Sequence, residues 1–189
     1  MNMSINIMKN SGFRKTLPEK MFYNRYFFLS EKTNMLDFVL FKPNSKKVAG
    51  EIYLRKSDKN FRPDYSGSSI IVDYIVAYRY NKGNGTSLMN FAKKYSKDNG
   101  CNGYIVLSAD PAFMPNKVPH TFYRKQGFTT LDEATDKKLD DFVKQNKNAR
   151  HTDFLSMLMY YPAPQKNVKR RGLLGIYDNL MNLIRYYQT

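Results

Sequence analysis

Apolar residues alternate with polar ones, or gather in short runs, along the first part of the chain. Three segments rich in aromatic and β-branched residues, 22–29, 36–41 and 48–55, are joined by short polar links. Segments of this composition are typical of β-strands, and short turn-like links favour antiparallel neighbours. The pattern predicts an antiparallel meander that follows a flexible polar leader over residues 1–20.

The centre of the chain changes to a different pattern. The apolar run 69–78 suits a strand that is buried on both faces, and a loop with Gly83 and Gly85 follows it. Residues 86–97 then carry apolar side chains at helical spacing, and 104–109 is a second short apolar run. The order strand, glycine loop, helix and strand predicts a βαβ unit with parallel strands and a right-handed crossover.

The last third mixes helical and strand-like segments. In chain order, we expect a short helix, a brief strand, a charged helix, a final strand and an amphipathic helix over residues 120–125, 128–130, 131–150, 153–162 and 173–187. A basic linker lies before the last helix. The whole pattern predicts an α/β fold with a mixed central sheet flanked by helices, and an additional C-terminal helix.

The composition indicates that these segments form one folded domain. The 189 residues, of which 42% are hydrophobic, are enough for one sizeable core. We assign that domain to residues 21–162 and the basic linker with its helix to residues 163–189. One cysteine and two histidines allow no disulfide within the chain and make a Cys/His metal site unexpected. We expect a cytoplasmic protein with no transmembrane segment and no metal.

The net positive charge of the chain indicates possible anionic partners. The formal net charge of +15 attracts anions such as nucleic acid, an acidic membrane, an acidic protein or a phosphorylated cofactor, although solubility alone explains it equally well. Basic residues also precede the C-terminal amphipathic helix. That helix can bind an anionic membrane or an acidic partner, or it can pack on its own domain or on a second copy in a homodimer.

The glycine loop is the first candidate for chemistry. It lacks the Gly-Lys-Ser/Thr ending of a Walker P-loop, and Leu88 stands where the dinucleotide fingerprint has its third glycine. What remains is the start of a helix, where backbone N–H groups and the helix dipole favour an anion. Glycines let a phosphate approach the backbone, and Arg79 and Lys82 add positive charge. The same glycines can also form a plain turn.

A second motif, NKVPHTFYRKQGF over residues 116–128, extends this observation. Together with the glycine loop it resembles the GNAT superfamily of acetyl-CoA-dependent N-acetyltransferases. Members carry Arg/Gln-x-x-Gly-x-Gly/Ala and, after a helix and a strand, Asn-x-x-Ala-x-x-Phe-Tyr-x-x-x-Gly-Phe. The residues in register here are Asn116, Phe122, Tyr123, Gly127 and Phe128. Tyr80 stands in the Arg/Gln position and Pro119 in the Ala position. The resemblance covers roughly residues 22–161.

The resemblance implies a GNAT-like fold and a site for acetyl-CoA as co-substrate. In the family, backbone N–H groups of the loop hold the pyrophosphate, and an N–H at the end of the preceding strand polarises the acetyl carbonyl. With the basic side chains of the loop, the cofactor-binding residues that we expect are Ile75, Val76, Arg79, Lys82, Gly83, Asn84, Gly85, Thr86 and Asn116.

The resemblance also implies a catalytic acid, and the chemistry requires a base. Tyr123 occupies the position of the family's usual general acid, and a phenol of pKa about 10 is suited to protonating a leaving thiolate. A protonated amine must lose a proton before it attacks. Asp73, in the middle of an apolar strand, is the first candidate base because desolvation raises the pKa of a carboxyl group, and Glu51 is the second. Each carboxylate can instead be a surface or salt-bridged residue, and Tyr123 can be merely packed.

Two functions stay open from the sequence. The first is an acetyl-CoA-dependent N-acetyltransferase whose amine acceptor, a protein, a peptide or a small molecule, is unidentified. The second is a catalytically inactive GNAT-like basic module that binds nucleic acid or a protein partner. The charge and the Tyr80 departure favour the second function, and the two motifs in register favour the first.

Overall fold

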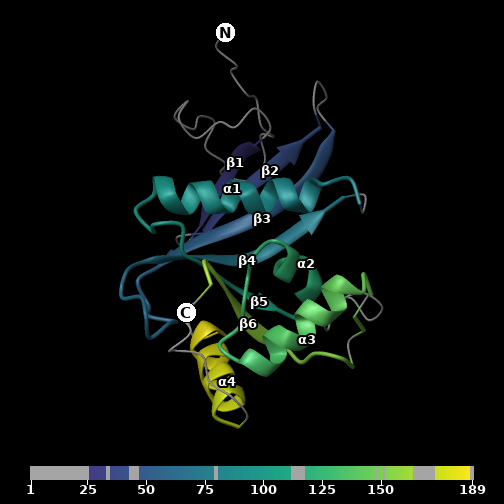
Figure 1. Ribbon diagram of the computed structural model, residues 1–189. Coiled ribbons are helices and arrows are strands. Elements are labelled where there is room, and N and C mark those ends of the chain that lie inside the picture. The colour runs from purple at the N-terminus through teal and green to yellow at the C-terminus, as the bar shows by residue number, and fades with distance from the viewer. Residues whose placement is uncertain are drawn as a thin grey trace. The chain divides into compact units, whose positions relative to one another are not determined.

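A computed structural model describes residues 26–32, 35–42, 47–78, 81–111, 118–147, 149–150, 152–163 and 173–187. Its elements are β1 (Tyr26–Lys32), β2 (Met35–Phe41), β3 (Val48–Ser57), β4 (Ser69–Ala77), α1 (Asn84–Asp98), β5 (Ile105–Ala109), α2 (His120–Lys125), α3 (Glu133–Lys144), β6 (Met157–Tyr161) and α4 (Leu173–Tyr187), which Figure 1 labels. The α/β fold class expected from the sequence is confirmed, and the elements follow the expected order except that residues 128–130 form no strand. The chain forms two compact units, Met1–Ser57 with Ile70–Asn102, and Asp58–Ser69 with Gly103–Thr189.

The first unit contains the predicted meander. Its strands follow the order β1-β2-β3-β4, and both β1 with β2 and β2 with β3 are antiparallel. β1 continues to Lys32, beyond the end at Leu29 that the sequence predicted, because the backbone ladder goes on to the pair Lys32↔Met35. Backbone pairing, which polar side chains do not prevent, therefore sets this boundary.

One face of this sheet packs against α1. Phe38 of β2 lies with its ring centroid 4.6 Å from that of Phe91 and 5.2 Å from that of Tyr95 on the helix. Ile52 and Leu54 of β3 are completely buried on the same face. Figure 1 shows α1 running across these strands. Burial of such side chains removes apolar area from water and is the main stabilising term of this unit.

Gly50 allows the close approach of β3, β4 and α1. A Cβ atom at this position would lie 2.6 Å from the Val76 carbonyl oxygen and 2.9 Å from Cδ1 of Leu88. Real Cβ atoms do not come so close to backbone oxygen, so only glycine fits here. The position matters for function because the end of β4 leads directly to the glycine loop.

The second unit contains β5 and β6, which pair antiparallel from Ile105↔Tyr161 to Ala109↔Met157. The brief strand expected over 128–130 is a single bridge, in which Thr129 and Tyr160 exchange backbone hydrogen bonds of 3.0 and 2.8 Å. β6 begins at Met157, later than predicted. The reason is a turn that comes first, in which the Asp153 carboxylate accepts a hydrogen bond from the N–H of Arg150 at 2.7 Å.

α4 packs one side against the second unit. The Asn182 amide donates to the Phe61 carbonyl at 3.4 Å and lies 3.3 Å from the Tyr160 hydroxyl, and Tyr186 is buried. The other side exposes apolar side chains, namely Tyr177, Leu180, Ile184 and Tyr187. The predicted amphipathic helix is confirmed. Among the helices that the structure describes, none is long and apolar enough to cross a membrane.

Candidate functional site

The turn between β4 and α1 is built from two residues with left-handed backbone. Asn81 has φ 60° and Gly83 has φ 74°. Gly83 is the N-cap of α1, so the helix begins at Asn84, earlier than the predicted start at residue 86. Gly85 therefore lies in the first helical turn rather than in the loop, which corrects the sequence-based interpretation. A single glycine with positive φ is enough to reverse the chain here.

Backbone N–H groups point out of this helix start. The first helical hydrogen bond runs from the N–H of Ser87 to the Gly83 carbonyl at 2.9 Å. The N–H groups of Asn84 and Gly85 precede that bond and have no acceptor within the helix. Glycine at the N-cap supplies no side-chain acceptor, and the first turn contains no acidic residue. The positive end of the helix dipole is therefore left for an anion.

The turn is held by contacts to the strands. The Asn84 amide donates to the Tyr78 carbonyl at 2.9 Å, and the Tyr78 N–H donates to the Ala49 carbonyl at 2.9 Å. These bonds fix the helix start to β3 and to the end of β4. Ile75 and Val76, which are half-buried, lie on the same end of β4. The structure thus brings together, within one unit, most of the expected cofactor-binding residues.

Space remains in front of this turn. A Cβ atom built on Gly83 would meet no atom within 4 Å, and both Gly83 and Lys82 are exposed. The glycine is thus required by its positive φ and leaves open a space that a larger group can enter. Arg79 and Asn116, two further expected cofactor-binding residues, lie outside the described residues, as does Tyr80.

Asp73 forms an ion pair across the strands. Both of its carboxylate oxygens accept hydrogen bonds from Arg55, at 3.1 and 2.9 Å, and both side chains are half-buried. This is the salt-bridged alternative that the sequence left open. A bidentate guanidinium stabilises the ionised carboxylate and occupies the lone pairs that a general base would use. Its role as a base stays a prediction that this pairing does not favour.

Glu51, the second candidate base, lies closer to the glycine turn along the sheet. The Tyr78 hydroxyl donates to its Oε1 atom at 3.0 Å. This hydrogen bond is the first cause of a raised Tyr78 pKa, followed by burial and by the negative charge of Glu51. The Glu51 carboxylate has a hydrogen-bond donor on one oxygen and no cationic partner in the described part of the chain. It therefore keeps more proton-accepting capacity than Asp73.

Tyr123 lies on α2 in the second unit. Its side chain is only 6% exposed, and its ring centroid is 6.0 Å from that of Phe128 and 5.3 Å from that of Phe122. Burial raises the pKa of its phenol well above the ordinary value. The hydroxyl is protonated at neutral pH, as a general acid must be, but the raised pKa makes it a weaker proton donor than the phenol of ordinary pKa that the sequence led us to expect. The position is also that of a packed aromatic residue, so its catalytic role stays a prediction.

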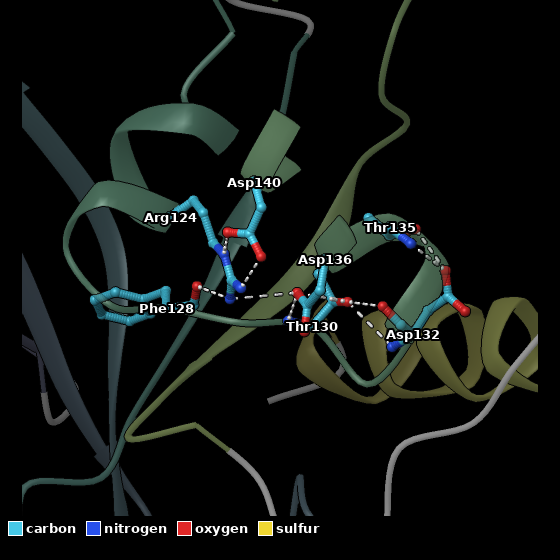
Figure 2. A network of polar contacts seen from close by, with 7 residues as sticks. All are labelled: Arg124, Phe128, Thr130, Asp132, Thr135, Asp136 and Asp140. Atoms are coloured by element: carbon cyan, nitrogen blue, oxygen red, sulfur yellow. Dashed lines mark hydrogen bonds and ion pairs between the residues drawn. The ribbon is translucent and has the colours of Figure 1, made fainter. Parts of the chain in front are cut away.

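A polar network fixes α2 against α3. Figure 2 shows the Arg124 guanidinium facing the Asp140 carboxylate, with donor-acceptor distances of 2.7 and 2.8 Å. Arg124 also donates to the Phe128 carbonyl at 3.2 Å and lies 3.7 Å from Asp136. The Asp136 carboxylate accepts the N–H of Thr130 at 2.8 Å. The network determines where α2, and Tyr123 with it, lies within the second unit.

His120 begins α2 and is completely buried. Its Nε2 atom lies 3.0 Å from the Leu155 carbonyl oxygen, which can only accept, so the neutral ring carries its proton there. Its Nδ1 atom has no hydrogen-bond partner among the described residues. Burial lowers the pKa of His120 to about 4, against the opposing effects of the Leu155 carbonyl and Asp110. The imidazole is thus neutral at pH 7.

Three features of this region were missed from the sequence. Gly50 gave a signal, because a glycine inside a strand often marks close backbone approach. The Arg55 to Asp73 pair and the Tyr78 to Glu51 hydrogen bond gave none, because their partners are 18 and 27 residues apart and meet only through the sheet.

No group of three or more His, Cys, Asp or Glu side chains that could hold a metal occurs among the residues the structure describes.

Comparison with known proteins identifies the family of this chain. The model of the acetyltransferase (GNAT) family matches residues 4–128, which is more than half of the 189-residue chain. The matched range includes both sequence motifs, the turn at Gly83 and α2. No curated protein matches the chain. With a family match of this length over an α/β fold of the expected element order, the chain belongs to the acetyltransferase (GNAT) family.

Proposed function

We propose that this protein is an acetyl-CoA-dependent N-acetyltransferase whose acceptor is an amine. The observation that supports it most is the start of α1, where a glycine N-cap with φ 74° stands before N–H groups that have no acceptor in their own helix. An anionic pyrophosphate suits such a helix start in geometry and in charge. Family membership supports acetyl transfer in general.

Residues of the α1 start and of the end of β4 bind acetyl-CoA in this proposal. The N–H groups of Asn84 and Gly85, and Thr86 in the same turn, hold the pyrophosphate, with charge from Lys82 and Arg79. An N–H at Ile75 or Val76 polarises the acetyl carbonyl, and Asn116 orients the cofactor arm. Their task is binding and electrostatic stabilisation of the oxyanion.

Proton transfer completes the proposed reaction. The acceptor ammonium gives one proton to a carboxylate, for which Glu51 is the better candidate because Arg55 occupies both oxygens of Asp73. The free amine attacks the thioester carbon, the carbon–sulfur bond breaks, the nitrogen releases its second proton to water, and the thiolate takes a proton from Tyr123. The products are the acetamide and free coenzyme A, and proton exchange with water restores the two side chains.

A turnover assay tests this proposal. The wild-type protein is mixed with acetyl-CoA and a panel of primary amines, and free thiol is detected with a thiol-reactive dye. We expect acetyl-CoA-dependent thiol release with at least one amine. Tyr123→Phe should lower kcat by about 100-fold or more, the lower range for loss of a general acid. Tyr177→Phe, at an exposed position of α4, is the matched control and should leave kcat unchanged.

Absence of both binding and turnover would contradict the proposed acetyl transfer. A folded wild-type protein that neither binds acetyl-CoA nor releases thiol with any amine is not an acetyltransferase. Steeply salt-dependent binding of nucleic acid in that case would indicate the basic-module function that the net charge of +15 also allows.

A further inference from the structure

The face of the first unit's sheet that is turned away from α1 carries a group of tyrosines and carboxylates. In the register of β2 and β3, Asp37 pairs with Tyr53 and Val39 with Glu51. Because side chains alternate along a strand, these residues lie opposite the face that holds Phe38, Ile52 and Leu54. We call the set Asp37, Glu51, Tyr53, Tyr74 and Tyr78 the acidic tyrosine face.

Contacts across the strands show that these side chains form one surface. The rings of Tyr53 and Tyr74 meet edge to face, with centroids 5.4 Å apart and an interplanar angle of 76°. The Tyr78 hydroxyl donates to Glu51 at 3.0 Å. Tyr74 is 53% exposed and Tyr78 is 44% exposed, so much of their aromatic surface is open to a ligand. Tyr74 and Tyr78, four residues apart, therefore offer aromatic surface to a ligand beside the Glu51 carboxylate.

The local charge is opposite to that of the whole protein. Of the described side chains of β2 and β3 on this surface, Asp37 and Glu51 carry negative charge, and the positive charge of Arg55 is balanced by its ion pair with Asp73 of β4. The whole chain has a formal charge of +15. After burial, Asp37 and then Glu51 raise the pKa of Tyr53, which is the expected response of a phenol to a negative environment. The surface therefore attracts cations.

Aromatic rings and carboxylates together are complementary to an ammonium group. A carboxylate binds it through charge and hydrogen bonds, and the face of a tyrosine ring adds a cation–π attraction. An aliphatic chain between two ammonium groups also covers exposed ring surface and removes it from water. We propose that the acidic tyrosine face binds a small aliphatic polyamine, which is the acceptor of the acetyl group, an assignment that rests on the proposed function.

The charge distribution selects a small amine over a basic protein or peptide. A basic macromolecule would meet the rest of a surface whose net charge is +15 and would be repelled. A small amine within about 8 Å of the face, the screening length at physiological salt, responds mainly to the nearby carboxylates. The local negative charge therefore favours a small amine over a large basic molecule.

The location also fits an acceptor site. Tyr78 directly follows β4 and leads into the glycine turn, and its hydroxyl contacts Glu51 of β3. The Asn84 side-chain amide of α1 donates to the Tyr78 carbonyl at 2.9 Å. An amine held at Glu51 is therefore in the same unit as the proposed pyrophosphate site and next to the strand end that would carry the thioester. The same carboxylate that attracts the ammonium group can take its proton.

Calorimetric titration of spermidine into the purified protein, without acetyl-CoA, tests the proposal. We expect saturable binding that Tyr74→Ser weakens about 5-fold, a typical cation–π contribution, and that Glu51→Gln weakens about 10-fold or more. Two matched controls should leave binding unchanged. Asp98→Asn removes an exposed carboxylate of the first unit that pairs with Lys94, and Tyr177→Ser removes an exposed tyrosine of α4.

Three outcomes would overturn it. Spermidine binding that the control variants weaken as much as the face variants is nonspecific attraction. Tighter binding of a lysine-rich peptide than of spermidine means that the occupant is a basic chain. Equal affinity in the wild type and in both face variants, with folding verified by circular dichroism, means that the amine binds elsewhere.

The same titrations with acetyl-CoA separate this inference from the proposed function. Binding of acetyl-CoA without binding of spermidine overturns only the acceptor assignment. Binding of spermidine without binding of acetyl-CoA overturns acetyl transfer and, with it, the acceptor role of the amine. Binding of both, with Glu51→Gln selectively losing spermidine, supports both proposals.

Discussion

The starts of α1 and α3 differ in how their N–H groups and the positive end of the helix dipole are satisfied. α3 begins at a capping aspartate, Asp132, whose carboxylate accepts the N–H of Thr135 at 2.8 Å, and its first turn contains Glu133 and Asp136. α1 begins at Gly83, which has no side chain, and its first turn contains no acid. The α3 start is neutralised by side chains of its own helix, whereas the α1 start has none and, in our proposal, binds an external anion.

The two helix starts also differ in burial and in the space around them. The α3 cap is buried and part of the network in Figure 2, in which polar groups of the same unit satisfy most of one another's hydrogen bonds. The α1 start is exposed, and an added Cβ at Gly83 meets nothing. Gly83 is required by its φ of 74°, and because it carries no side chain the helix start beside it stays open to a ligand.

The largest expected effect comes from making the α1 start resemble the α3 start. Gly83→Glu places a carboxylate where the pyrophosphate would bind, so like-charge repulsion should weaken acetyl-CoA binding by more than about 1,000-fold, or about 4 kcal/mol. Calorimetry measures the dissociation constant. Gly100→Glu is the matched control, because Gly100 ends the same helix with φ 77° and also has open space around its Cβ position. Equal loss of binding in both variants would contradict the comparison.

A third helix start, at His120 of α2, predicts a pH effect. Its pKa is lowered to about 4 by burial, against an ordinary value of 6.5. Between these values the unfolded chain binds a proton that the folded chain does not, so stability is fully present above pH 6.5 and falls as the pH approaches 4. The loss amounts to at most about 3 kcal/mol. Chemical denaturation at several pH values measures it, and His120→Gln should flatten this part of the profile. An unchanged profile would show that other groups cause the acid sensitivity.

Removal of the α3 cap should destabilise the protein without affecting the ligand. Asp132→Ala deprives the Thr135 N–H of its acceptor and should cost about 1–2 kcal/mol in free energy of unfolding. Denaturant titration measures the loss, and calorimetry should show unchanged acetyl-CoA affinity. Asp141→Ala, at an exposed position of α3, is the control and should stay close to the wild type. A large loss of acetyl-CoA affinity in Asp132→Ala would mean that the two helix starts are not independent.

The smallest effect should come from Gly83→Asn. Asparagine tolerates positive φ better than other residues, so the turn at φ 74° is kept and stability should change little. Its neutral side chain enters the open space and should weaken acetyl-CoA binding by about 10-fold, or about 1.4 kcal/mol. Competition of the wild type and the variant for a fluorescent coenzyme A analogue can measure such a difference. A variant that binds as well as the wild type would show that the ligand avoids this space.

Periodicity predicted the elements well because each strand and helix buries one face. The apolar positions of β3 and of α1 follow their periods closely, and both elements were recovered within a few residues. Boundaries failed where a local hydrogen bond decides them, as at the Arg150 to Asp153 turn before β6 and at Gly83 before α1. A capping or turn residue can be used in several ways, and the sequence alone does not determine which one is used.

The chemistry of the candidate site was predicted less completely. The motifs located the glycine turn and Tyr123, because both depend on residues that are close in sequence. The partner of Asp73 is Arg55 on the neighbouring strand, and only the pairing of β3 with β4 reveals it. The same is true of Tyr78 and Glu51. Side-chain partners across a sheet depend on register, and register is set by the whole unit.

The most direct test of the central claim observes the backbone amides at the start of α1. In a ¹⁵N-labelled sample titrated with acetyl-CoA, the amide signals of Asn84 and Gly85 should shift more than those of Asn99 and Gly100 at the other end of the helix. These shifts should saturate with the calorimetric dissociation constant. Saturable binding of acetyl-CoA that leaves the signals of Asn84 and Gly85 in place would contradict the assignment of the pyrophosphate to this helix start.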